Sequence, residues 1–290
     1  MKYLFSILLA CLFTSCCAKD NPKINIKVKV DSIAIKKLPE DLRKTPLEIM
    51  NEYAGWEIDS VKTLENNKEG LRFLINGKGK ENIEKRNMGT QIVEPKPNSD
   101  NQIWSYIVLG DMQKEKPFEF EVLYFPQATA IVAYSPVKDS LKKYNDKTDI
   151  ILMTKPDMKL RMINFFENTI FTIPMATGKN PGNKKQSGDK KTPEGIFTVY
   201  AIHDASDWDY DFKDGKGRIK GTYGKHFIRF KENYHIGIHG THLPETVGLR
   251  ATEGCIRLTN ENIDSIVTMV ARQKTLMIVT PAMEDYKVDN

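Results

Sequence analysis

The apolar residues of this chain fall mostly into short segments typical of β-strands. From residue 24 to residue 30 every second residue is Ile or Val, and the residues between them are polar, which is the pattern of a strand with one buried face. Short runs rich in β-branched and aromatic residues follow, bounded by turn-forming residues. They predict strands at residues 71–75, 103–109, 118–125, 129–134, 150–153, 160–165, 169–175, 195–202, 227–230, 236–238 and 276–279.

Two segments carry helix signals instead. Thr45-Pro46-Leu47-Glu48 combines an N-cap residue, a proline at the first helical position and a glutamate three residues after the cap, a typical helix start. Gly55 would end that helix. The second segment has apolar residues at the helical spacing i, i+3, i+4 and i+7, namely Ile263, Ile266, Val267 and Val270. We expect a helix there with one buried stripe, capped by Thr259 or Asn260.

These elements divide the chain into two folded units. Residues 24–146 combine strands with the first helix and are interpreted as an α+β N-terminal domain of unknown role. Residues 147–282 are predicted to be a mainly β domain with one C-terminal helix, followed by a tail at 283–290. Within the second unit, residues 179–191 are rich in Lys, Asn and Gly and lack core-forming side chains. This charged run predicts a mobile, solvated loop.

The N-terminus has the features of an export signal. A lysine at position 2 is followed by an apolar run from residue 3 to residue 13 and by small residues before Cys16, which resembles a bacterial lipoprotein signal. Residues 1–15 would be the signal peptide, Cys16 the lipidated residue and residues 16–23 a tether. Cys11 fits a similar pattern but leaves too short an apolar region, and a plain membrane anchor is the alternative. We expect a cell-envelope protein, periplasm-facing or on the surface, that is held to a membrane by its lipid.

Composition narrows the class of protein. With 290 residues and 40% hydrophobic content, the chain can bury one or two cores, which excludes wholesale disorder and a disulfide miniprotein. The net charge of +5 comes from basic residues interleaved with acidic ones. A nucleic-acid partner is therefore not expected, since no dense basic stripe is present.

Cys255 is the one cysteine that lies outside the first 17 residues. A lone cysteine is most often a small buried hydrophobe, but its neighbours favour chemistry. Gly254 permits unusual backbone angles, the successive amides of residues 253–255 can converge on an oxyanion, and Arg257 would favour the thiolate. A cysteine nucleophile needs a base, and His239, 16 residues earlier at the end of a predicted strand, can act as one if a backbone carbonyl holds its imidazole.

Three histidines between residues 234 and 242 also raise the possibility of a metal site. On a strand that rises about 3.3 Å per residue, His235 and His239 would be about 13 Å apart, too far to share one zinc ion. A turn at Gly237 would be needed to bring them together. We therefore predict no metal and keep a zinc hydrolase as a third reading.

Several ordered motifs together resemble the catalytic domain of the L,D-transpeptidases, the YkuD family. They are Thr177-Gly178, Thr192-Pro193-Glu194-Gly195-Ile196-Phe197, Ile238-His239-Gly240-Thr241, Gly248, and Thr252-x-Gly254-Cys255-Ile256-Arg257-Leu258 with Asn260. The resemblance covers residues 149 to 282, about half the chain. It implies a β-sandwich-like domain in which a cysteine attacks peptidoglycan stem peptides, forms a thioester, releases D-alanine and makes 3→3 cross-links. No cofactor is implied, and the partners would be donor and acceptor stems.

The resemblance assigns roles to individual residues. Cys255 would be the nucleophile and His239 the base, with the carbonyl of Gly240 orienting the imidazole. The amides of Glu253, Gly254 and Cys255 would form the oxyanion site. The remaining matches are expected at the substrate site, namely Arg257, Asn260, Thr241 and, in the region of the family's groove, His226. The segment 208–212 can line that groove as a lid or simply pack as a loop.

One position departs from the family pattern. Members often have histidine immediately before the Gly-Cys pair, where this chain has Glu253. A carboxylate beside the thiol disfavours the thiolate and can change the acceptor. An L,D-carboxypeptidase, an endopeptidase and a protein-attaching enzyme therefore remain open, as does a wall-binding lipoprotein without catalysis.

Overall fold

The computed structural model describes residues 29–30, 55–66, 70–79, 105–109, 117–134, 150–165, 168–231, 235–270, 275–282 and 284–285. The predicted helix that starts at Thr45, the signal peptide, Cys16 and most of the strand from residue 24 lie outside these residues. Within them the protein is mostly β, as predicted, with a single α-helix in the second unit. None of the helices described is long and apolar enough to cross a membrane.

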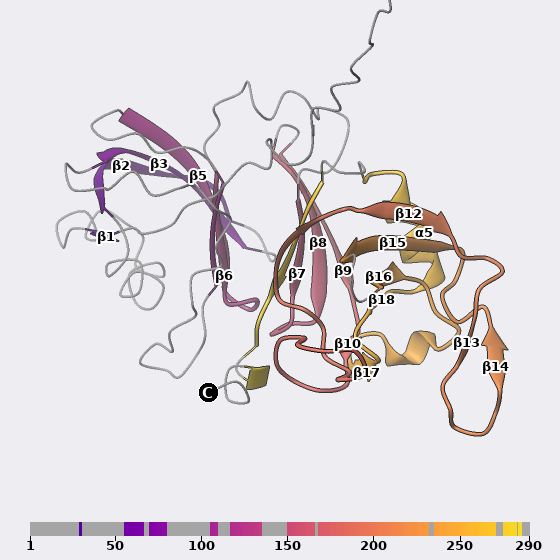
Figure 1. The fold of residues 1–290 in the computed structure, drawn as a ribbon. Coiled ribbons are helices and arrows are strands. Elements are labelled where there is room, and N and C mark those ends of the chain that lie inside the picture. The colour runs from indigo at the N-terminus through magenta and orange to yellow at the C-terminus, as the bar shows by residue number, and fades with distance from the viewer. Residues whose placement is uncertain are drawn as a thin grey trace, which may run out of the picture.

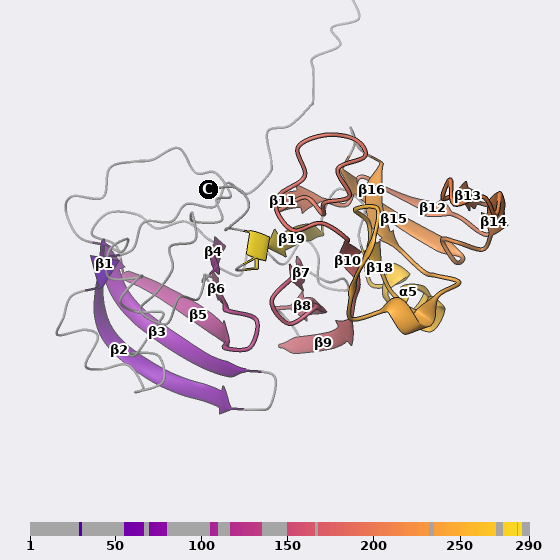
Figure 2. The same cartoon turned by 90° about the horizontal axis from the view of Figure 1, so that it is seen from below.

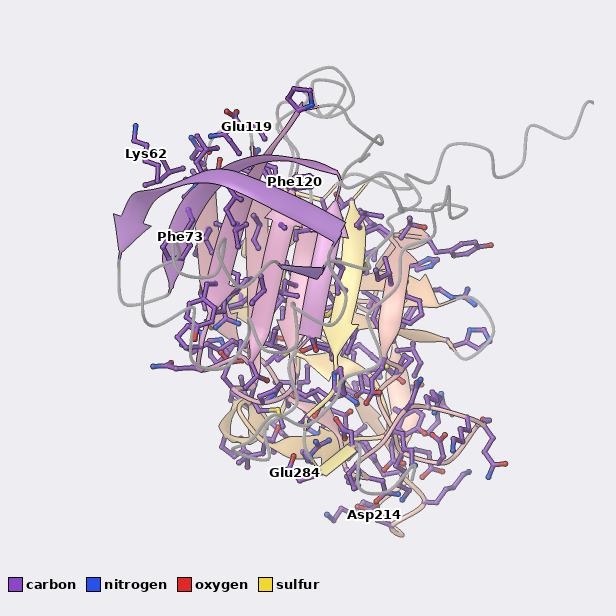
Figure 3. The ribbon with its side chains drawn as sticks, turned by 90° about the vertical axis from the view of Figure 1, so that its left-hand side faces the viewer. Lys62, Phe73, Glu119, Phe120, Asp214 and Glu284 are labelled. Carbon is purple, nitrogen blue, oxygen red and sulfur yellow. The ribbon has the colours of Figure 1, made fainter. Side chains whose placement is uncertain are left out.

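The N-terminal unit contains one six-stranded sheet (Figures 1 and 2). Its strands, in the order β1-β2-β3-β5-β6-β4, are Lys29–Val30, Gly55–Asn66, Leu71–Gly79, Pro117–Phe125, Ala130–Tyr134 and Ser105–Leu109. Phe73 and Phe120 lie on its inner face, whereas Lys62 and Glu119 project outward (Figure 3). The strands predicted at residues 71–75, 103–109, 118–125 and 129–134 are confirmed where the structure describes them, and β2 is an additional strand that begins at Gly55. Of the strand predicted from residue 24, only β1 is described.

The second unit is built on two sheets. A five-stranded sheet has the order β11-β19-β7-β8-β9, with strands Gly195–Thr198, Leu276–Thr280, Ile150–Thr154, Lys159–Asn164 and Thr169–Pro174. A four-stranded sheet has the order β12-β15-β16-β18, with strands Ala201–Asp204, His226–Lys231, Ile236–His239 and Ile256–Arg257. Two short pairs complete the unit: β10 (Thr177–Gly178) with β17 (Arg250–Thr252), and β13 (Asp209–Asp211) with β14 (Arg218–Lys220).

The main core of this unit lies between the two sheets. Ile151, Met153 and Met277 from the five-stranded sheet share one buried cluster with Ile238 and Ile256 from the four-stranded sheet. The helix α5, Asn260–Val267, closes this core with Ile263 and Ile266, which confirms the predicted stripe. Its N-cap is Thr259, whose side chain accepts a hydrogen bond from the Asn262 N–H, so the first of the two proposed caps is correct.

One predicted strand is divided in the structure. Residues 195–202 were expected to form a single strand, but β11 belongs to the five-stranded sheet and β12 to the four-stranded sheet. The chain changes sheets at residues 199 and 200. There the Val199 N–H donates to Thr275 O and the Tyr200 N–H donates to Arg229 O. The prediction of extended strands is correct on both sides of this point. The error lies in the pairing, because β11 bonds to β19 and β12 bonds to β15.

The N-terminal sheet packs against β8 and the turn that follows it. The rings of Tyr134 and Phe165 stack with 3.7 Å between centroids, and the Arg161 guanidinium lies 4.9 Å from the centre of the Phe125 ring. In Figure 1 the five-stranded sheet stands between the N-terminal sheet and the four-stranded sheet. The described part of the N-terminal domain therefore contacts the second unit on the side away from the four-stranded sheet.

Candidate active site

Strand pairing brings Cys255 and His239 to one face of the four-stranded sheet. Cys255 immediately precedes β18, which runs parallel to β16 with His239 opposite Arg257. Side chains alternate along a strand, so Cys255, Arg257 and His239 share one face while Ile238 and Ile256 point into the core. Two residues 16 positions apart in sequence thus lie diagonally across adjacent strands.

A glycine stands beside the cysteine on the neighbouring strand. When the register of β16 and β18 is extended by one residue, Gly237 lies opposite Cys255. Gly237 is two residues before His239. A Cβ placed on Gly237 would come within 2.3 Å of the Phe227 ring and 2.7 Å of Ile228 O. The strand β15 therefore passes so close that only glycine fits. Gly237 lies inside a strand and makes no turn, so His235 and His239 remain at opposite ends of β16.

His239 is held in a defined tautomer. Its Nδ1 lies 2.6 Å from Gly240 O, and because a carbonyl only accepts, Nδ1 carries the hydrogen and Nε2 is the basic nitrogen. Burial lowers the pKa of His239 to about 4, the Gly240 hydrogen bond acts in the opposite direction, and the Arg257 charge lowers it further. The imidazole is therefore neutral at physiological pH.

Aromatic rings enclose this histidine. The Phe227 ring stacks parallel to the imidazole at 5.7 Å, and Tyr223 meets it edge to face at 4.9 Å. Burial and the neighbouring Cys255 raise the pKa of Tyr223, so its hydroxyl stays protonated. Trp208 contacts both Tyr223 and Phe227 and thereby covers the same face of the sheet. Trp208 of the segment 208–212 therefore packs beside the site, an arrangement that fits both the lid and ordinary loop packing.

Cys255 is a free, half-buried cysteine. Burial raises the pKa of its thiol to about 11, while a hydrogen bond from the Gly237 backbone and the charges of Lys184 and Arg257 act in the lowering direction. The Sγ atom lies 3.9 Å from His235 O. In the resting protein the thiol is thus protonated, and a base is required to generate the thiolate.

The turn that carries the cysteine depends on Gly254. This residue has φ of 128°, and a Cβ there would lie 2.8 Å from Lys191 O, so only glycine fits. Its N–H donates to Thr252 Oγ1 at 3.1 Å, and the Thr252 hydroxyl donates to Cys255 O at 2.6 Å. The expectation that three successive amides converge is therefore not met at Gly254, whose N–H is turned toward Thr252. The amides of Glu253 and Cys255 are the remaining pair.

The Glu253 carboxylate forms ion pairs with two lysines of the loop at residues 179–191. Its Oε1 lies 2.9 Å from Lys179 Nζ and its Oε2 lies 3.5 Å from Lys190 Nζ. Partial burial raises the pKa of Glu253, but the two lysines outweigh it and the net shift is downward. Glu253, at the position where the resemblance led us to expect histidine, is therefore ionised and paired with Lys179 and Lys190.

The loop at residues 179–191 is not a purely solvated run. Lys184 is buried and forms an ion pair with Asp189, and Lys191 O touches the position of Gly254. The prediction of a solvated loop fails for Lys184 because a charge run read from sequence does not reveal which lysine folds inward.

The other predicted residues divide into two groups. Asn260 Oδ1 accepts from the Thr241 N–H at 2.8 Å and fills the space above Gly240, so Asn260 and Thr241 hold the loop after His239. Arg257 is buried and donates to Thr246 Oγ1 at 2.8 Å, close to the cysteine and histidine. These three residues support the loops beside the cysteine and the histidine.

His226, predicted to contact substrate, lies elsewhere. Its neighbour Phe227 pairs with His239, so alternation places His226 on the opposite face of the sheet. There His226 Nε2 is 3.4 Å from Asp264 Oδ1 of α5. The structure does not bring His226 together with the cysteine.

Three residues near the site carried no recognisable sequence signal. Tyr223 lies in a turn, Phe227 has the pattern of an ordinary strand residue, and Lys184 is one of five lysines between residues 179 and 191. Their proximity to the histidine and cysteine arises from pairing between distant segments. Nowhere in the described residues do three or more His, Cys, Asp or Glu side chains gather as metal ligands would.

Comparison with known proteins assigns the second unit. Residues 149–279 match the family described as L,D-transpeptidase catalytic domain, YkuD. This unit is an L,D-transpeptidase catalytic domain. The predicted fold class and family are confirmed for this part of the chain. The L,D-transpeptidase domain places its Gly-Cys turn and His-Gly pair on one sheet face, as described above.

Solved structures resemble the chain more weakly. The helical cell shape determining protein Pgp2 from Campylobacter jejuni is 23% identical, covering 49% of this chain and 54% of that chain, with a TM-score of 0.34. An L,D-transpeptidase from Mycobacterium smegmatis is 13% identical, covering 78% of this chain and 99% of that chain, with a TM-score of 0.37. Bd1075 from Bdellovibrio bacteriovorus is 21% identical, covering 49% and 54%, with a TM-score of 0.31. The match spans about half the length of the C. jejuni and Bdellovibrio proteins. No curated protein matches the chain.

Proposed function

We propose that this protein is a cysteine-dependent L,D-transpeptidase that joins peptidoglycan stem peptides through a thioester, forming 3→3 cross-links with release of D-alanine. The observation that carries the proposal is the shared sheet face of Cys255 and His239, with His239 Nδ1 bound to Gly240 O. That bond directs the basic Nε2 away from the carbonyl and leaves it available for proton transfer.

The first half-reaction requires a proton acceptor because the thiol is neutral at rest. Nε2 of His239 takes the Cys255 proton as Sγ attacks the carbonyl carbon that joins the third stem residue to D-alanine. The amides of Glu253 and Cys255 donate to the oxyanion that develops. Collapse of the tetrahedral intermediate breaks the C–N bond, and the imidazolium returns the proton to the departing D-alanine amine. A thioester on Cys255 remains.

The second half-reaction repeats these steps in reverse. An amine of the acceptor stem attacks the thioester carbonyl, His239 removes a proton from that amine, and the thiolate leaves and is reprotonated. Because Tyr223, Phe227 and Trp208 cover the same face, they restrict water near the acyl group. An enclosed acyl-enzyme favours transfer to an amine over hydrolysis.

Mass spectrometry of disaccharide-tetrapeptide incubated with residues 18–290 tests this function. Wild type is expected to produce dimers that lack one D-alanine, and Cys255→Ala is expected to produce none. His239→Ala should lose the product as well, whereas His226→Ala, which alters a side chain on the opposite face of the sheet beside Asp264, should retain it. Tripeptide monomers in place of dimers would mean an L,D-carboxypeptidase. An untouched substrate, or dimers formed equally by Cys255→Ala, would contradict the proposal.

We also propose that Cys16 carries a lipid that anchors the enzyme in the cell envelope. The support is the sequence alone, a short charged start and an apolar run that ends just before this cysteine. Mass spectrometry of the protein purified from membranes should find an acylated N-terminus at Cys16. Recovery of unmodified protein from the soluble fraction would contradict this anchor.

A further inference from the structure

The loop of residues 179–191 shares a boundary with the turn that carries the nucleophile. It connects β10 to the turn before β11, and its last residue, Lys191, places a carbonyl 2.8 Å from where a Cβ of Gly254 would be. Directly after it, Thr192 Oγ1 donates to Gly254 O at 2.9 Å and accepts from Gly178 N–H at 2.8 Å. The start and end of the loop are therefore fixed against the Gly-Cys turn.

One lysine of this loop is folded inward. The side chain of Lys184 is 3% exposed, and its Nζ lies 2.6 Å from Asp189 Oδ1. Lysine is seldom buried without a reason, because removing an ammonium from water is costly. The neighbouring lysines show that the local sequence can place this residue type at the surface, since Lys185 is exposed.

Asp189 fixes the position of this ammonium. Its carboxylate accepts N–H groups of Lys185, Gln186 and Lys191 in addition to the Lys184 ammonium. Burial raises the pKa of Asp189, but these donors outweigh it and the net shift is strongly downward. The carboxylate stays ionised and gives the loop a rigid centre to which Lys184 is attached.

The buried ammonium faces the cysteine turn. Lys184 Nζ lies 3.5 Å from the point where a Cβ of Gly254 would be. Its charge is one of two that favour the Cys255 thiolate, the other being Arg257, and burial of the thiol acts against both. Glu253 on the same turn is occupied by Lys179 and Lys190.

We propose that Lys184 is a positioning residue of the active site, whose ammonium, held by Asp189, stabilises the Cys255 thiolate formed when the imidazole takes the proton. This proposal rests on the proposed role of Cys255 as the nucleophile. The S–H bond breaks, its proton moves to His239 Nε2, and the electron pair stays on the sulfur that follows the turn faced by the Lys184 ammonium. The charged and titratable groups around the thiol are Lys184, Arg257, His239, Tyr223 and, on the turn itself, Glu253 with its two lysines.

The test is the alkylation rate of Cys255 in the full chain, followed by iodoacetamide labelling and mass spectrometry of the Cys255 peptide between pH 7 and 9. Lys184→Met is expected to raise the pKa of the thiol by about one unit, which lowers the thiolate fraction about tenfold. The more basic thiolate is more nucleophilic, so the net loss is about fourfold at each pH. Lys184→Arg should restore most of the rate because it keeps the charge.

Two further variants separate electrostatics from loop structure. Asp189→Asn removes the counter-charge, so the thiol should react as fast as wild type or faster, although the loop has lost its best acceptor. Lys185→Met removes an exposed charge from the same loop and should leave the rate unchanged. If Lys184→Met matched wild type, or if Asp189→Asn slowed the reaction as much as Lys184→Met, the proposal would be overturned.

Alkylation needs no peptidoglycan, which keeps this test distinct from that of the proposed function. Suppose that the alkylation rates change as expected but the wild-type protein does not turn over the tetrapeptide. That result would overturn the proposed reaction and leave the electrostatic role of Lys184 intact. Turnover by wild type with no rate change in Lys184→Met would overturn the role of Lys184 alone.

Discussion

At the scale of single residues, the candidate site is a neutral pair. Burial raises the pKa of the Cys255 thiol to about 11 and lowers the pKa of His239 to about 4. The thiolate and imidazolium therefore do not form at rest, unlike in cysteine enzymes whose thiol pKa is strongly lowered. Charge separation must wait until the substrate supplies an oxyanion and the turn amides stabilise it. A neutral resting thiol is also less open to oxidation.

The histidine sets the acid limb of the activity profile. His239 can accept a proton only when neutral, and its lowered pKa keeps it neutral down to about pH 4. We expect kcat/KM for the tetrapeptide to fall below about pH 4 and to be level through pH 6. The measurement is initial rate against pH at low substrate concentration. A limb with its midpoint near 6.5, the ordinary value for histidine, would show that burial does not control this group.

At the scale of elements, the spacing between β15 and β16 determines where the histidine ring sits. Phe227 occupies the space above Gly237 and stacks on His239. The Phe227 ring therefore has two effects. It leaves room only for glycine at position 237, and it restrains the imidazole of His239. A larger residue at 237 must displace the ring or separate the two strands.

Replacement of Gly237 tests this arrangement. In Gly237→Ala the new methyl group would overlap the Phe227 ring, so we expect a loss of about 1–3 kcal/mol in the free energy of unfolding and at least a tenfold fall in kcat. Urea unfolding and the turnover assay measure the two effects. Gly215→Ala is the control: its Cβ meets nothing within 4 Å, so backbone strain of about 1 kcal/mol is expected without a change in kcat. Wild-type turnover by Gly237→Ala would refute this role of the ring.

The pattern of apolar and polar residues was sufficient to predict most strands and the helix α5. It did not predict which strands pair with one another. The apolar runs in residues 150–175 and the helical spacing after Thr259 are local properties, and the strands and the helix that they predict are where expected. The run 195–202 looks continuous, yet hydrogen bonds to Thr275 and Arg229 divide it between two sheets. Cys255 and His239 could be identified from motifs. Lys184 and Tyr223 could not, because long-range packing alone selects them from residues of the same type.

At the scale of the whole molecule, a buried ion cluster ties the C-terminus to the catalytic unit. Lys155, at the end of β7, is 2.6 Å from Glu194 and 3.2 Å from Asp285, and neither Lys155 nor Asp285 is appreciably exposed. Asp285 also accepts the Gly182 N–H at 2.7 Å and pairs with Arg250 at 3.0 Å. Residue 285, expected in a free tail, is instead part of the fold and helps to hold the lysine-rich loop.

Removal of this carboxylate should weaken the whole domain. Asp285→Asn leaves Lys155 and Arg250 short of a counter-charge, so we expect the free energy of unfolding to fall by about 3 kcal/mol. Burial raises the pKa of Asp285, but the charges of Lys155 and Arg250 and the N–H groups of Ala282 and Gly182 together outweigh it, so the net shift is downward. The stabilisation is therefore complete above the ordinary carboxyl pKa of about 4 and declines as the pH falls further. The difference from wild type should shrink between pH 4 and pH 2 in urea titrations.

A neighbouring acid supplies the control for this prediction. The side chain of Glu284 is 70% exposed and lies 3.9 Å from Arg250, so Glu284→Gln should change stability by less than about 0.5 kcal/mol. Equal effects of the two variants would mean that net charge near the C-terminus, and not the buried cluster, stabilises the domain.

The aromatic cover of the site also makes the protein its own optical reporter. Trp208 lies 5.6 Å from Tyr223 and 5.4 Å from Phe227, which in turn contact His239, and about a third of its side chain faces solvent. Indole emission is sensitive to the polarity around the ring. If a stem peptide binds at this face, as proposed above, its arrival changes the solvent contact of Trp208. With Trp56 and Trp104 replaced by Phe, the intensity and wavelength of that single emitter follow substrate arrival and acyl transfer in real time, without a label on either partner.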